Sequence, residues 1–108
     1  MYLNENTKRI IREKIYSEMR PKQVILFGSY AYGTAIVESD IDLMIIEQNI
    51  VGSKVKEAVK IKRILSEVNM PKDILVVSEE EFEFYKTEAG PVIRDAYERG
   101  EALWNLMI

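Results

Sequence analysis

The 108-residue chain contains no cysteine and no histidine, and it has only five glycines and three prolines. Without cysteine there can be no disulfide, no thiolate nucleophile and no cysteine-rich metal site. Without histidine, the Ser-His-Asp and Cys-His mechanisms and histidine-ligated zinc are excluded. Any metal ion must therefore be bound by oxygen atoms, which are the ligands that Mg²⁺ and Mn²⁺ prefer.

Long apolar segments and an excess of positive charge are also missing. No apolar run reaches the roughly 20 residues needed to cross a membrane, and the first residues lack the pattern of a signal peptide. We therefore expect a cytoplasmic protein without membrane contact. Eighteen acidic residues against fifteen basic ones give a net charge of -3, which argues against direct binding of nucleic acid. The length predicts a single domain spanning residues 1–108.

The pattern of apolar residues predicts alternating helices and strands, an α/β (α+β) fold with a small mixed β-sheet in the order αβαβαβα. Thr7 and Ser78 are expected to cap helices, and Trp104 is expected to pack a C-terminal tail onto the core. The expected strands are 23–27, 41–46 and 72–77, and the expected helical segments are 7–19, a short turn at 29–32, a helix from 53 to about 68, one beginning at 79, and 91–99.

Two short motifs surround the loop between the first two strands. Gly28-Ser29 directly follows the first strand, where glycine permits close approach of a ligand and the amides of a helical turn can hold an anion. Asp40 and Asp42 stand at the start of the second strand, two residues apart and hence on one face. Such paired carboxylates repel one another unless a cation binds between them. Taken singly, each motif has an ordinary structural explanation as a turn or a surface acid.

The proposed site also predicts how the strands pair. Gly28, at the end of the first strand, can meet Asp40, at the start of the second, only if these strands are antiparallel. The long helix before the third strand suits a parallel crossover, which would place Asp73 beside Asp42. Three acids and an anion-binding turn at one edge of a sheet would be an improbable coincidence. This convergence, rather than any one motif, favours a functional site.

The pattern Gly28-Ser29-x₁₀-Asp40-x-Asp42, followed by Asp73, resembles the signature of the DNA polymerase β nucleotidyltransferase superfamily. The size and order of elements are similar to those of the minimal nucleotidyltransferases (MNT), antitoxin partners of HEPN-domain toxins. The resemblance implies that Gly28 and Ser29 bind the β- and γ-phosphates of ATP. It also implies that Asp40 and Asp42 hold one Mg²⁺, and that Asp73 joins them in holding a second.

The resemblance further implies transfer of AMP from ATP to a hydroxyl, with tyrosine expected, on a cognate HEPN-type toxin. So small a core leaves little surface for a small acceptor, which favours a protein substrate. One alternative is a non-catalytic antitoxin that masks its partner, and another is a small-molecule (antibiotic) nucleotidyltransferase acting as a homodimer. Tyr30 and Tyr32 depart from relatives with Gly-Ser-x-Ala-Arg-Gly, because tyrosine cannot make the bidentate phosphate contacts of arginine. This departure favours the masking alternative, and Lys22 and Lys54 are candidates to supply the missing charge.

Overall fold

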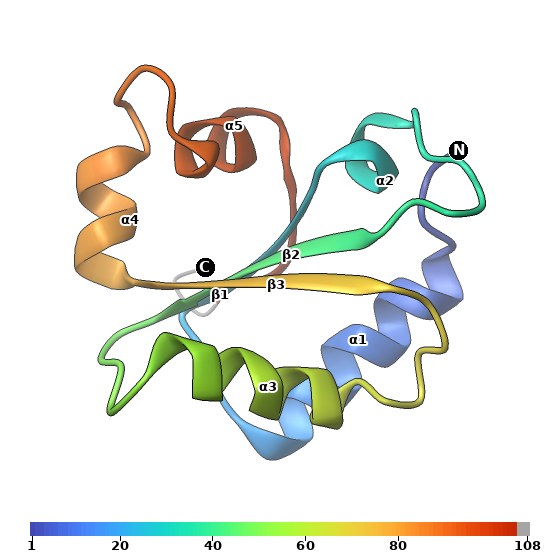
Figure 1. Ribbon diagram of the computed structural model, residues 1–108, viewed down its shortest axis with the longest axis horizontal. Coiled ribbons are helices and arrows are strands. Elements are labelled where there is room, and N and C mark those ends of the chain that lie inside the picture. Colours follow the sequence, from blue (N-terminus) through green and yellow to red (C-terminus); the bar gives the residue numbers. More distant parts are fainter. Residues whose placement is uncertain (106–108) are drawn as a thin grey trace.

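The computed structural model describes residues 1–105. They form five helices and four strands around one mixed sheet (Figure 1). In chain order the elements are α1 (Glu5–Glu18), β1 (Gln23–Phe27), α2 (Ser29–Tyr32), β2 (Ile41–Glu47), α3 (Lys54–Ile64), β3 (Lys72–Ser78), α4 (Glu79–Tyr85), α5 (Val92–Arg99) and β4 (Glu101–Asn105).

The sheet has the strand order β3-β2-β1-β4. Strand β1 is antiparallel to both β2 and β4, and β2 is parallel to β3. Both strand pairings expected from the site are therefore confirmed. The fourth strand is a correction, because the sequence predicted only a packed tail there. Strand β4 is short and buries only Leu103 fully, so its apolar pattern carries no strand signal, and its pairing with β1 determines its conformation.

Helices cover both faces of the sheet (Figure 1). Helices α1 and α3 lie on one face, and α4 and α5 lie on the other; the short α2 is drawn on the side of α4 and α5 but contributes Tyr30 to the core under α1 and α3. The larger core, under α1 and α3, includes Ile11, Ile15, Leu43, Ile45 and Ile61. The smaller core, under α4 and α5, consists of Ile25, Met44, Ile46, Val77, Phe82 and Ala96. Consecutive residues of β2 thus alternate between the two cores, as side chains of a strand do.

Three helix boundaries test the capping predictions. Helix α1 begins earlier than expected, because the Asn4 side chain accepts hydrogen bonds from the backbone N–H of Asn6 (2.7 Å) and of Thr7 (3.3 Å). Thr7 is therefore not the N-cap; asparagine caps at least as well and precedes it. Helix α3 ends at Ile64 rather than near residue 68. The cap at Ser78 is confirmed, with reciprocal hydrogen bonds to Glu81.

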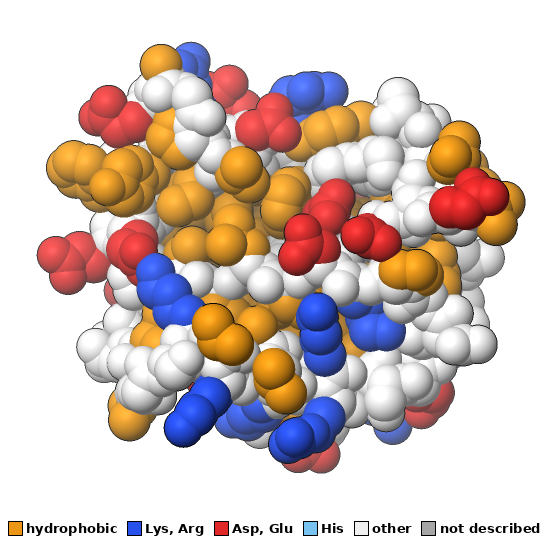
Figure 2. Space-filling model, viewed as in Figure 1, with side chains coloured by type: hydrophobic (Ala, Val, Ile, Leu, Met, Phe, Trp, Pro, Cys, Tyr) orange, Lys and Arg blue, Asp and Glu red, His pale blue; other side chains and the backbone are white. Residues whose placement is uncertain are grey.

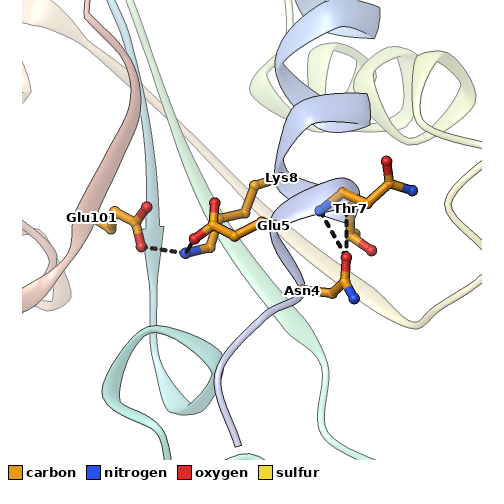
Figure 3. A network of polar contacts seen from close by, with 6 residues as sticks. Asn4, Glu5, Thr7, Lys8 and Glu101 are labelled. Atoms are coloured by element: carbon orange, nitrogen blue, oxygen red, sulfur yellow. Dashed lines mark hydrogen bonds and ion pairs between the residues drawn. The ribbon is translucent and has the colours of Figure 1, made fainter.

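Two contacts attach β4 to the rest of the fold. The buried Lys8 ammonium lies 2.8 Å from a Glu101 carboxylate oxygen and 3.3 Å from one of Glu5 (Figure 3). Trp104 donates from Nε1 to the carbonyl of Pro21 (2.9 Å) and packs edge-on against Tyr16. The expected packing role of Trp104 is confirmed. No helix within residues 1–105 is long and apolar enough to cross a membrane.

Candidate active site

The strand registers bring the predicted site residues to one end of the sheet. Phe27 pairs with Asp42 across β1 and β2, so that Gly28 follows immediately beside the acid. Asp42 pairs with Asp73 across β2 and β3. Both acids lie on the face covered by α4 and α5, because each is an even number of positions along its strand from residues of the smaller core, such as Met44 on β2 and Val77 on β3. Figure 2 shows acidic side chains gathered toward the starting ends of these strands.

Gly28 is held in a conformation that other residues avoid, with φ 72° and ψ -160°. A Cβ atom at this position would lie 2.1 Å from Oδ2 of Asp42, so the backbone passes directly against the carboxylate. The Gly28 carbonyl accepts the first hydrogen bonds of α2, from Ala31 and Tyr32. The first N–H groups of a helix have no partner inside it. Those of α2, which begins at Ser29, lie next to the acid that a metal-bound phosphate would approach.

The acids influence one another electrostatically. Burial, together with the negative charges of Asp73 and Asp40, raises the pKa of Asp42 to about 6. Asp40 lies just before β2 and is exposed, as is Asp73. A cation would relieve this repulsion, and carboxylate oxygens are the donors that Mg²⁺ prefers. The residues therefore fit a divalent ion, although within residues 1–105 no three acidic side chains form a ready-made metal-ligand cluster.

The two tyrosines of the motif have different environments. Tyr30 is buried in the larger core, and its hydroxyl donates to the carbonyl of Ile36 (3.4 Å). The Tyr32 hydroxyl donates to a carboxylate oxygen of Asp95. The guanidinium of Arg99 lies over the Tyr32 ring, with Cζ 3.8 Å from the ring centroid. Tyr30 is thus a core residue, whereas Tyr32 links α2 to α5.

The two lysines that could have supplied charge to the site lie elsewhere. The backbone N–H of Lys22 bonds to Ile46 near the far end of β2, and its ammonium is 3.8 Å from Glu79. The ammonium of Lys54 is 2.6 Å from Glu81. Both acids follow β3, at the end of the sheet opposite Asp73. Neither lysine supplies charge to the turn formed by Gly28 and Ser29.

Two features were missed by sequence reasoning, one in the site and one outside it. Asp95 and Arg99 stand four residues apart on α5, which indicates a helical ion pair, but their position against Tyr32 depends on the tertiary structure. The second is an apolar hollow of about 380 Å³ between β3, α4 and α5. Its lining includes Leu75, Val77, Tyr85, Pro91, Val92 and Ile93.

A mixed sheet that places a Gly-Ser turn against paired acids at one edge defines the nucleotidyltransferase class of fold. The chain belongs to the nucleotidyltransferase family, since the family model described as "Nucleotidyltransferase domain" matches residues 5–103. Nucleotidyl transfer is accordingly its class of reaction. None of the curated proteins matches the chain in sequence.

Solved structures confirm the fold. One is a toxin–antitoxin with AMP-PNP, with a TM-score of 0.64 and 20% identity, covering 91% of this chain and 73% of that one. The toxin–antitoxin MntA-HepT has a TM-score of 0.60 and 16% identity, covering 96% of this chain and 74% of that one. A third is a tri-AMPylated Shewanella oneidensis HEPN toxin in complex with MNT antitoxin. Its TM-score is 0.52 at 16% identity, and the match covers 93% of this chain and 74% of that one.

Proposed function

We propose that this protein transfers AMP from ATP to a tyrosine hydroxyl of a HEPN-type toxin and thereby acts as the antitoxin of that toxin. The observation that carries the proposal is the position of Asp42, which lies against Gly28 on one side and beside Asp73 on the other. The similar folds of an AMP-PNP complex and of an MNT antitoxin bound to an AMPylated HEPN toxin support the choice of nucleotide and partner.

The site residues would divide the work between phosphate and metal. Gly28 and Ser29 would bind the β- and γ-phosphates through backbone N–H groups and the Ser29 hydroxyl. Asp40, Asp42 and Asp73 would hold two Mg²⁺ ions, or Mn²⁺ in their place. When bound, these ions would neutralise the charge that develops on the phosphate and on the leaving group.

The tyrosine oxygen of the acceptor forms a bond to the α-phosphorus, and the bond from that phosphorus to the oxygen of pyrophosphate breaks. The acceptor proton passes to solvent water. The product is an AMP ester of the toxin, and pyrophosphate leaves with the negative charge.

The position of the transferred label tests this reaction. The purified chain is incubated with Mg²⁺, a HEPN-domain protein from the same genome, and ATP labelled at either the α- or the γ-phosphate. We expect the α-label, and not the γ-label, to become attached to the HEPN-domain protein. Attachment of the γ-label would instead indicate phosphoryl transfer, and failure of both labels to attach would exclude this acceptor.

A second candidate is an antitoxin that masks its partner by binding alone. It is favoured by Tyr32, whose hydroxyl is bound to the carboxylate of Asp95 beside the phosphate-binding turn. The two candidates differ in cells that express the toxin. Masking predicts that the double variant Asp40→Asn, Asp42→Asn still protects growth, whereas adenylyl transfer predicts that protection is lost.

A further inference from the structure

A basic residue outside the family motif lies close to the phosphate-binding turn. The Arg99 guanidinium lies over the Tyr32 ring at 3.8 Å, and Tyr32 is the last residue of α2, the short helix that begins at Ser29. Figure 1 shows α5, which carries Arg99, on the same side of the sheet as α2. Arg99 is thus placed next to α2 by its contact with the Tyr32 ring.

Contacts connect this arginine with the acids of the site. The Tyr32 backbone N–H donates to the carbonyl oxygen of Gly28 (3.1 Å). Gly28 in turn lies against the carboxylate of Asp42. Asp42, Gly28, Tyr32 and Arg99 therefore form one continuous series of neighbours across β2, α2 and α5.

The guanidinium also retains the capacity to bind an anion. Its side chain is 59% exposed, and within residues 1–105 its hydrogen-bond partner is Asp95, at a long 3.4 Å. An arginine held flat on an aromatic ring keeps its edge N–H groups available, and that edge matches two phosphate oxygens. The stacked position thus orients the donors, and the long contact with Asp95 leaves them able to bind an anion.

We propose that Arg99 is a nucleotide-binding residue that contacts the triphosphate, with the Tyr32 ring as its support and Asp95 as a competing anion. This inference rests on the proposed function for the presence of a nucleotide, and it assigns to α5 a role in phosphate recognition. It explains how the chain can bind phosphate with tyrosine at position 32: the positive charge comes from another helix.

Calorimetric titration of the intact chain with ATP and with AMP, both in Mg²⁺, tests the assignment. We expect Arg99→Gln to weaken ATP binding about tenfold, the effect of one exposed charge-assisted contact, and AMP binding less than about twofold. Arg99→Lys should recover part of the loss. Asp95→Asn should strengthen ATP binding, because it removes the competing negative charge and keeps a polar partner for Tyr32.

Arg94 on the same helix provides the matched control. It is bound to Glu98 (2.7 Å), so Arg94→Gln should leave both affinities unchanged. The inference is wrong if Arg99→Gln and Arg94→Gln have the same effect, or if Arg99→Gln weakens ATP and AMP equally. A wild-type chain that binds no ATP would instead overturn the proposed function itself. Thermal unfolding of each variant identifies a purely structural loss, which would lower the melting temperature without changing the preference for ATP over AMP.

Discussion

Removal of the Asp42 charge should stabilise the metal-free protein at neutral pH. Burial and the neighbouring acids raise the pKa of Asp42 from 3.8 to about 6. The folded chain therefore binds this proton more tightly than the unfolded chain does. Stability is lost as pH rises from about 4 to about 6, and above that range the ionised carboxylate imposes a constant cost on folding. Asp42→Asn removes the cost.

The size of the effect follows from the pKa difference. Each pKa unit corresponds to about 1.4 kcal/mol, so the full shift sets an upper limit of about 3 kcal/mol. Because Asp42 is only half-buried, solvent screening reduces this value. We expect a gain of about 1–2 kcal/mol at pH 7.5, or roughly 5–10 °C in melting temperature for a domain of this size, and little gain near pH 4.

Urea unfolding in EDTA at pH 7.5 and pH 4 measures the gain. A second series in Mg²⁺ asks whether the acids bind the ion: Mg²⁺ should stabilise the wild-type protein more than Asp42→Asn, since a ligand stabilises the state that binds it. Equal stability of Asp42→Asn and the wild type at pH 7.5 in EDTA, or a gain as large at pH 4 as at pH 7.5, would show that the ionised Asp42 carboxylate does not destabilise the fold.

Three further substitutions test other parts of the structure. Gly28→Ala should lower the free energy of unfolding by about 2 kcal/mol and abolish ATP binding, because φ is positive and the new Cβ would lie 2.1 Å from Oδ2 of Asp42. Unchanged stability in urea and unchanged ATP affinity in calorimetry would argue against this packing. Burial and the adjacent Glu57 raise the pKa of Glu47 to about 7. Glu47→Gln should therefore increase the free energy of unfolding by about 1 kcal/mol at pH 8 and by less at pH 5. A gain in stability that did not grow with pH would contradict this expectation. Ser78→Ala should cost about 1 kcal/mol through loss of the cap of α4, and a change below about 0.3 kcal/mol in chemical unfolding would show that the cap contributes little.

The parts of the fold that sequence reasoning predicted well are those with strong local signals. Strands β1, β2 and β3 are short apolar runs bounded by Gly28, Asp40 and Pro71, so their existence and limits follow from local chemistry. The antiparallel pairing of β1 with β2 was expected because Gly28 must meet Asp40, and the parallel pairing of β2 with β3 because a long helix connects them. The observed registers place Gly28 and Asp73 on either side of Asp42.

The features that were missed depend on contacts between distant segments. Strand β4 is paired because Lys8 and the neighbouring strand hold it, not because its own five residues favour a strand. The role of Arg99 depends on where α5 crosses α2, which no local pattern encodes. Thr7 is a good capping residue, but Asn4 stands about one turn earlier and accepts hydrogen bonds from the N–H groups of Asn6 and Thr7, so the helix begins before Thr7.

The most direct test of the central claim is transfer of α-labelled AMP from ATP to a HEPN-domain partner, compared among three forms of the chain. These are the wild type, a double variant that carries both Asp40→Asn and Asp42→Asn, and a control variant, Glu47→Gln. The control changes an acid at the other end of β2. The account predicts labelling by the wild type and by Glu47→Gln, and none by the double variant. Labelling by the double variant at the wild-type rate would contradict the assignment of the site.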